Sequence, residues 1–395
     1  MRPKYGIHLS SQLPADQPKR QDQRMSKKIP LFDTVTPLVP LRERIDAAIA
    51  AVIDSGRFIL GPEVRAFEAE FSDYVGASFG VGVGNGTDAI TIALRALGIG
   101  PGDDVIVPAF TFFASAEAIP ATGARPVFCD IDPQTFNMTL ESVTAALTPR
   151  TRAIVVVHLF GAPAPMPELV DFAREHDLVI VEDAAQAVGA KLQGRAVGSF
   201  GDAATFSFFP SKNLGAFGDG GMIVTSNADA AERARRLRLH GSTDKSTHSE
   251  VGYNSRLDEI QAAILRVLLP ELDSWNAARR RAAREYVAAG IGDFAAPQKI
   301  DPACEPVYHL FMVSHDQPEL LIGALTEANI EARGYYRVPI HLQPAMAEFA
   351  AAGELPGTAE AARSNIALPI SPSISQWQIA HVVDTARAAA LENAK

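Results

Sequence analysis

Short apolar runs alternate with amphipathic stretches along most of this chain. The runs include DVIVP from Asp104, AIVVVHLFG from Ala153, LVIV from Leu178 and GMIVTS from Gly221. Helical patterns such as PAPMPELVDFAREH lie between them. Continuously apolar runs of this length are typical of strands buried on both faces, with the intervening helices covering a parallel sheet. The sequence therefore predicts an α/β fold with a mostly parallel sheet flanked by helices.

The chain length and a shift in composition predict two domains. A chain of 395 residues is too long to fold around one simple hydrophobic core, and its length suits a large domain followed by a smaller one. We predict a disordered or leader segment over residues 1–28, since it is polar and has no signal-peptide core. A large cofactor-binding domain is expected over 29–270 and a smaller C-terminal α/β domain over 271–395. Met25 is an alternative start.

Proline and glycine predict several local boundaries. The proline-rich arm IPLFDTVTPLVP is expected to be extended. One helix is predicted to end at Gly56, the next to begin at Pro62 and end before Gly76, and a long helix from about Glu259 to Ala289 to be broken by Pro270.

Composition disfavours several classes of protein. The net charge of −10 and the isoelectric point near 5.4 argue against a nucleic-acid-binding surface. No apolar run approaches the roughly eighteen residues that a membrane span needs. The two cysteines, Cys129 and Cys304, are far apart and do not have the spacing of a metal site. We therefore expect a cytoplasmic protein without a metal, a nucleic-acid partner or a membrane partner.

A carboxylate and a lysine follow two neighbouring strands of the predicted sheet. The run LVIV gives way to Glu182 and Asp183. A second strand, ATFSFF, is stopped by Pro210, and Lys212 follows in a glycine-rich loop. Ligands of open α/β sheets bind at the carboxyl ends of the strands. Although single Asp and Lys residues in loops usually face solvent, this shared position predicts that both belong to one site.

These residue types match the requirements of pyridoxal phosphate. That cofactor needs a lysine amine to bond with its aldehyde, an acid beside its pyridine nitrogen and donors for its phosphate. Lys212 supplies the amine, whose pKa must fall for it to attack as a free base. Asp183 suits the ring nitrogen, Gln186 the ring hydroxyl and Ser207 the phosphate. We predict pyridoxal 5'-phosphate as the cofactor.

A second candidate phosphate site lies in FGVGVGNGTDAITIALRAL, which predicts a strand, a glycine turn and a helix. Residues 84–89 match the loose dinucleotide pattern. However, Asp103 and Asp104 precede the next strand instead of following it, so the acidic residue of that pattern is misplaced. A single phosphate bound by the amides of Gly86 and Thr87 explains the same turn. A turn needed only for chain reversal is the alternative.

Taken together, these motifs resemble the DegT/DnrJ/EryC1/StrS family of sugar-nucleotide aminotransferases, which share the aspartate aminotransferase fold. The resemblance runs from about Phe32 to the last helix. The matching segments are GNGTDAITIALRALGIGPGDDVIVPAFTF, VEDAAQAVGA, SFGDAATFSFFPSKNLGAFGDGG, GYNSRLDEIQAAIL and PIHLQP.

The resemblance implies an aminotransferase that converts a nucleotide-linked keto-hexose to the amino sugar, with glutamate as the amino donor. Lys212 would act as general base and acid, moving a proton between the Cα atom of the amino donor and the cofactor carbon. Phe112 would stack over the pyridine ring. Asn254 would reach across a homodimer to the phosphate in the partner's site, although asparagine is also a common turn residue. NGTDAI and EDAAQAVGA are more similar to members that aminate C3, which favours a 3-keto-6-deoxy or related sugar.

Several alternatives stay open at this stage. Amination at C4, a pyridoxal-phosphate-dependent sugar dehydratase or lyase, a dinucleotide oxidoreductase and a non-catalytic regulator are each compatible with part of the sequence. Family members often have Tyr-Pro-Gly-Lys where this chain has FPSK at residues 209–212, and the loop GSTDKSTHSEVGYN also departs from the family pattern. His309, Tyr336 and His341 are candidate substrate contacts, with burial in the core as the alternative for each.

Overall fold

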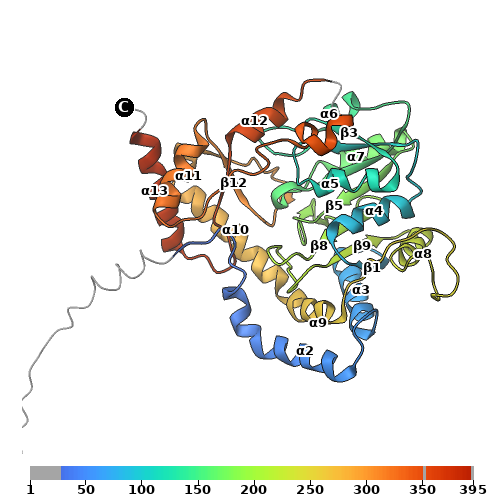
Figure 1. The fold of residues 1–395 in the computed structure, drawn as a ribbon. Helices are drawn as coiled ribbons and strands as arrows, with labels where there is room; N and C mark the ends of the chain where they lie inside the picture. The colour runs from blue at the N-terminus through green and yellow to red at the C-terminus, as the bar shows by residue number, and fades with distance from the viewer. Residues whose placement is uncertain (1–27, 350–352, 393–395) are drawn as a thin grey trace, which may run out of the picture.

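The structure is a computed structural model that describes residues 28–349 and 353–392 (Figure 1). The predicted leader therefore lies almost entirely outside the described residues.

A seven-stranded sheet forms the centre of the larger part. Its strand order is β1-β9-β8-β5-β4-β2-β3. Strand β9 is antiparallel to both of its neighbours, and the other six strands are parallel to one another. This confirms the predicted mostly parallel sheet. The strands are β1 (Phe79–Val83), β2 (Asp104–Pro108), β3 (Arg125–Cys129), β4 (Thr151–Val157), β5 (Val179–Asp183), β8 (Ala203–Ser207) and β9 (Gly221–Thr225).

Helices cover both faces of this sheet, because successive strand residues point to opposite sides. On one face, α4 (Gly86–Ala96), α5 (Ala114–Glu117) and α8 (Ala228–Leu237) pack on side chains such as Val105, Val155 and Ile223. On the other, the helices are α2 (Arg42–Ser55), α3 (Pro62–Val75), α6 (Leu140–Ala145), α7 (Met166–Glu175) and α9 (Glu259–Leu268). The chain thus buries both sides of its apolar strands.

Glycine and proline set the ends of the first helices as the sequence predicts. Helix α2 ends at Gly56, which has φ 64°, and α3 ends at Gly76, which has φ 83°. Glycine adopts this left-handed conformation without steric cost. Pro62 begins α3, where its missing amide hydrogen is not needed.

The long helix expected from Glu259 is interrupted at Pro270, as predicted. Helix α9 is followed by the 3-10 turn η4 (Leu269–Glu271) and then by α10 (Leu272–Ala288). Proline has no amide hydrogen and clashes with the preceding turn, so the helix cannot continue through it unchanged. Helix α10 leads into the C-terminal part of the chain (Figure 1).

The C-terminal part has its own core. A three-stranded antiparallel sheet of β10 (Ala296–Pro297), β12 (Phe311–Ser314) and β13 (Asn365–Leu368) packs with α10, α11 (Pro318–Glu327) and α13 (Gln376–Glu392). Ile29 packs in this core as well and pairs with Ile330. The remaining elements are β6 (Lys191–Leu192), β7 (Arg195–Ala196), β11 (Cys304–Glu305), α12 (Pro356–Ser364) and short 3-10 turns.

Two local expectations differ from the structure. The arm from Ile29 was expected to be extended, but Thr36–Leu41 forms the 3-10 helix η1, since Pro37 and Pro40 fit helical φ values. The strand expected to reach Phe209 ends at Ser207, because Phe208 and Phe209 already turn into the lysine loop.

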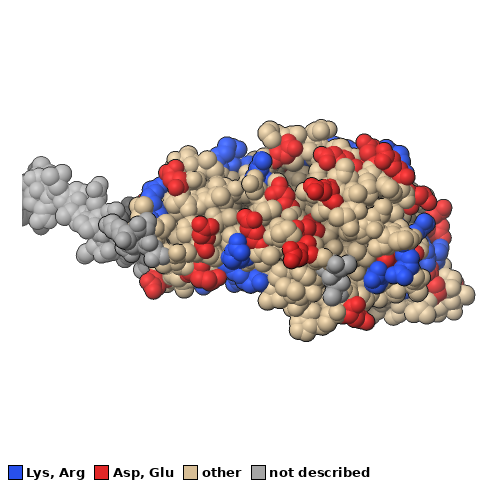
Figure 2. Space-filling view, turned by 90° about the horizontal axis from the view of Figure 1, so that it is seen from above, with Lys and Arg blue, Asp and Glu red and all other residues tan. Residues whose placement is uncertain are grey.

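Acidic and basic side chains are interspersed over the face seen in Figure 2. Within the described ranges, no helix is both long and apolar enough to cross a membrane.

Candidate active site

A cavity of about 810 Å³ lies at the carboxyl ends of the central strands. It is lined by the turn after β1, the segment after β2, the end of β5, the loop after β8 and two segments of the C-terminal part. Nine of the predicted site residues line it: Gly86, Thr87, Phe112, Asp183, Gln186, Ser207, Lys212, His309 and Tyr336. The glycine turn and the lysine thus share one cavity.

Lys212 is held in a tight loop after β8. Its amide donates to the carbonyl of Phe209 at 2.8 Å, and a Cβ at Gly215 would lie only 2.5 Å from the carbonyl oxygen of Pro210. Burial lowers the pKa of Lys212 to about 8, against the opposing effect of the negative charge on Asp183. The neutral amine, which is the nucleophilic form, is therefore accessible near neutral pH.

Asp183 is fixed at the end of β5 and is 5% exposed. One carboxylate oxygen accepts a hydrogen bond from the Ser115 hydroxyl at 2.6 Å, and the other accepts from the amide of Ala185 at 3.1 Å. Thr111 lies 3.1 Å from Ser115 and extends this network. Ser115 was not predicted from the sequence, because a serine after a strand carries no distinctive signal.

The neighbouring carboxylate, Glu182, faces the other side of β5 and is fully buried. It accepts hydrogen bonds from the amides of Gly198, Phe200 and Gly201 at 2.7–2.8 Å. Its second oxygen lies 3.1 Å from Nε2 of His158, whose Nδ1 accepts from the amide of Ala164 at 3.0 Å. Nε2 therefore carries the proton that His158 donates. This network ties the end of β5 to two loops.

The turn after β1 can receive a phosphate. The first amides of a helix have no intrahelical acceptor, and the side chain of Asn85 caps only the amide of Asp88 in α4, while its carbonyl accepts from the amide of Ala89. A Cβ at Gly86 would lie 2.9 Å from Cβ of Ser207, so the glycine allows β8 and this turn to approach closely. Gly86, Thr87 and Ser207 consequently line one end of the cavity.

These residues fit pyridoxal phosphate. The amides of Gly86 and Thr87 and the hydroxyl of Ser207 can donate to the phosphate. The buried carboxylate of Asp183 can accept from the ring nitrogen. Lys212 lies in the same cavity with a lowered pKa. The ring of Phe112, which is 57% exposed, also lines the cavity and is free to stack on a flat ligand.

Gln186 connects two strained segments at the cavity wall. Its amide oxygen accepts from the amide of Phe160 at 2.8 Å, and its amide nitrogen donates to the Tyr336 hydroxyl at 3.2 Å. Phe160 and Tyr336 both have positive φ values, 60° and 54°, and their rings stack with centroids 6.1 Å apart. Such backbone conformations are costly for aromatic residues and persist only where packing enforces them.

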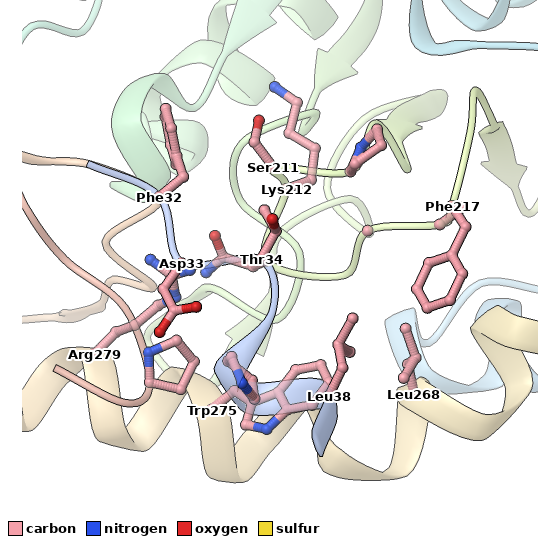
Figure 3. Close-up of a pocket in the computed structure, with 16 residues that line it drawn as sticks. Phe32, Asp33, Thr34, Leu38, Ser211, Lys212, Phe217, Leu268, Trp275 and Arg279 are labelled. Carbon is pink, nitrogen blue, oxygen red and sulfur yellow. The ribbon is translucent and has the colours of Figure 1, made fainter. Parts of the chain in front are cut away.

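Lys212 also borders a second cavity of about 380 Å³ on the side of the N-terminal arm (Figure 3). Phe32, Trp275 and Arg279 are among its lining residues. Arg279 is buried and donates to the carbonyls of Tyr308 and Ile370 at 3.2 Å each. Helix α10 and the arm thus lie below the lysine loop in Figure 3, on the other side of this second cavity.

The structure separates the remaining predicted residues. His309 lines the main cavity, is 4% exposed and stacks on Phe32 with centroids 5.6 Å apart. Burial and the nearby charges of Lys212 and Arg279 lower its pKa. His341, in the 3-10 turn η6 (Ile340–Leu342), lies outside the cavity with its ring centroid 6.2 Å from that of Phe128 on β3, and the next turn, η7 (Pro344–Phe349), packs against the same strand.

Asn254 also lies outside the cavity. It is exposed, and its backbone forms a bridge with Leu239.

Among the described residues, no group of three or more His, Cys, Asp or Glu side chains could hold a metal ion.

Comparison with known proteins gives consistent matches. The model of the DegT/DnrJ/EryC1/StrS aminotransferase family matches residues 40–387. A relative from Geobacillus stearothermophilus, named a pleiotropic regulatory protein, is 45% identical over 361 residues, covering 90% of this chain and 97% of the relative. A dTDP-3-amino-3,4,6-trideoxy-alpha-D-glucose transaminase from Streptomyces venezuelae is 47% identical over 365 residues, covering 91% and 96%.

A solved structure extends the similarity to the fold. It is the crystal structure of DesV from S. venezuelae in complex with a ketimine intermediate. It matches with a TM-score of 0.89 and 46% identity, covering 92% of this chain and 99% of DesV.

Proposed function

Since this chain belongs to the DegT/DnrJ/EryC1/StrS aminotransferase family, and is therefore a pyridoxal-phosphate-dependent aminotransferase, we propose that it aminates C3 of a nucleotide-linked keto-hexose. The observation that carries the proposal is the cavity that brings Lys212, Asp183 and the turn at Gly86 together. When bound, the cofactor would supply an aldehyde carbon that takes up the amino group and a ring that withdraws electrons.

Each residue has a specific task in this proposal. Lys212 would hold the cofactor through its amine, and the same amine, when free, would remove and return a proton as general base and acid. A pKa of about 8 suits both directions of that transfer near neutral pH. Asp183 would keep a proton on the ring nitrogen, while Gly86, Thr87 and Ser207 would bind the phosphate. Gln186 and Phe112 would contact the ring.

The choice of C3 and of the amino donor rests on similarity. The S. venezuelae relative is named for a sugar with its amino group at C3, and it covers 91% of this chain. Glutamate is proposed as the donor because it is the donor expected for the family. His309 and Tyr336 line the cavity and are the proposed sugar contacts.

We also propose a homodimer with shared active sites. Asn254 is exposed outside its own cavity, which is the position required of a residue that contacts the partner's phosphate. Exposed apolar side chains lie on the arm and around both cavities, namely Val35, Val39, Phe112, Phe209 and Phe217.

The two cysteines bear on the compartment. Cys129 and Cys304 are free thiols, which supports the reducing cytoplasm as the working compartment.

An absorption spectrum tests the proposed reaction. The purified protein should show a visible band near ~420 nm from lysine-bound cofactor, moving toward ~330 nm when glutamate is added. Lys212→Ala should lose the visible band, whereas Lys191→Ala, a change at an exposed lysine of β6, should keep it. Adding a 3-keto-sugar nucleotide should then restore the band, and a 4-keto-sugar nucleotide should not.

Other results would select other functions. A band that glutamate does not move would keep the cofactor and favour a lyase or another donor. The name of the G. stearothermophilus relative raises a regulatory role for this chain as a second candidate. A protein that binds no pyridoxal phosphate and transfers no amino group would favour that role.

A further inference from the structure

The main cavity contains two basic side chains among its described lining residues, Lys212 and Arg333. Lys212 is committed to the cofactor in the proposed function and must lose its charge to act. Arg333 comes from the C-terminal part of the chain and keeps its charge at any physiological pH. It is therefore the one permanent positive charge that the described cavity wall offers to a ligand.

Arg333 forms no salt bridge with a described carboxylate; Glu331 attracts it from beyond salt-bridge distance, and its side chain donates to the Tyr335 hydroxyl. Its charged neighbours in the same segment, by contrast, are paired. Glu331 pairs with Lys28 and accepts from the amide of Leu31. Arg337 pairs with Glu319 at 2.9 Å and donates to the carbonyls of two α12 residues. The segment thus satisfies its other charges on the protein and leaves the guanidinium of Arg333 exposed at the cavity.

The backbone of Arg333 is fixed, so its position is not that of a loose surface side chain. Its amide donates to the carbonyl of Ala367 on β13 at 3.3 Å, and its carbonyl accepts from the amide of Ala367 at 2.8 Å. The guanidinium lies 6.0 Å from the ring centroid of Tyr335, which also lines the cavity. A cation over an aromatic face is held there at low cost.

We propose that Arg333 is the carboxylate-binding residue of this cavity. This inference rests on the proposed function, since an amino acid donor brings a carboxylate to the cavity and Arg binds carboxylates with two parallel hydrogen bonds. The acidic residues of the wall, Asp88, Asp183 and Asp219, repel such a group and cannot hold it. The same guanidinium suits the carboxylate of an acidic sugar, so the ligand chemistry has two possible sources.

Binding of unreactive probes tests the site without any turnover. Glutarate, which has two carboxylates and no amine, represents the donor, and its binding is measured by titration calorimetry. UDP-glucuronate and UDP-glucose represent acidic and neutral sugar nucleotides. The variants are Arg333→Gln, Arg333→Lys and the matched control Arg337→Gln, which removes the same charge four residues away but outside the cavity. Thermal unfolding confirms that each variant is folded.

If the donor supplies the carboxylate, Arg333→Gln should weaken glutarate binding by about 10- to 100-fold, as loss of a charge-assisted pair predicts. Arg333→Lys should give an intermediate loss, because it keeps the charge but not the two-pronged geometry. Arg337→Gln should bind like the wild type. If the sugar supplies the carboxylate, Arg333→Gln should bind glutarate as the wild type does. The wild type's preference for UDP-glucuronate over UDP-glucose should then disappear in Arg333→Gln.

Two results would overturn the inference. One is equal binding of glutarate and of both sugar nucleotides by Arg333→Gln and wild type. The other is a wild type that neither binds glutarate nor prefers the acidic sugar nucleotide. A missing visible band in the spectrum contradicts the proposed function instead, and it does not affect these binding measurements.

Discussion

Replacing Glu182 by Gln should destabilise the protein out of proportion to the size of the change. One oxygen of Glu182 accepts from the amides of Phe200 and Gly201, and the other accepts from Gly198 and faces Nε2 of His158. A glutamine can keep the first oxygen. Its NH2 group, however, then faces two donors, an amide and an imidazole N–H.

The imidazole cannot relieve this conflict by moving its proton. Nδ1 of His158 already accepts from the amide of Ala164, so the proton stays on Nε2. Two buried donors lose their acceptor, and each costs about 1–3 kcal/mol. The expected loss is therefore about 2–6 kcal/mol. For 395 residues the unfolding entropy is about 0.8 kcal/mol per kelvin, so Tm should fall by about 2–7 °C.

Thermal unfolding measures the global loss, and hydrogen exchange locates it. Amides in residues 198–201 should exchange faster in Glu182→Gln than in wild type, while those of α13 should not change. Glu175→Gln, at an exposed position on α7, is the matched control and should shift Tm by less than about 1 °C. A Glu182→Gln protein with wild-type Tm and unchanged exchange at 198–201 would refute the hydrogen-bond assignment.

Three further predictions concern the cofactor site. In protein freed of cofactor, labelling of Lys212 by an amine reagent should rise through a midpoint near pH 8, since burial lowers its pKa and only the neutral amine reacts; a midpoint near that of an exposed lysine, about 10.4, would contradict this. Ser115→Ala removes a 2.6 Å charge-assisted bond to Asp183, so the dissociation constant for pyridoxal phosphate should rise about 10-fold or more in a fluorescence titration. An unchanged constant would mean that the bond does not support cofactor binding. Gly221→Ala places a Cβ 2.3 Å from the carbonyl oxygen of Asn85. It should lower the free energy of unfolding by about 1–3 kcal/mol, measured by denaturation, and weaken cofactor binding in the same titration. Wild-type values in both would show that this contact relaxes freely.

The local sequence determined the elements and the chemical identity of the site. Continuous apolar runs predicted the parallel strands, and Gly56, Gly76 and Pro270 predicted helix boundaries, because the conformations of glycine and proline depend on the residue itself. Asp183 and Lys212 were predicted to share a site, since both follow parallel neighbouring strands whose carboxyl ends must meet at one edge.

The tertiary structure decided which distant residues complete that site. Ser115 reaches Asp183 from a different loop, and Arg333 reaches the cavity from the C-terminal part. His341 stands in the motif that resembles the family, yet its ring lies against Phe128 of β3, outside the cavity. Nothing in the local pattern distinguishes these outcomes. The direction of a side chain on a loop depends on packing against residues far away in the chain, whereas strand and helix periodicity depends on near neighbours.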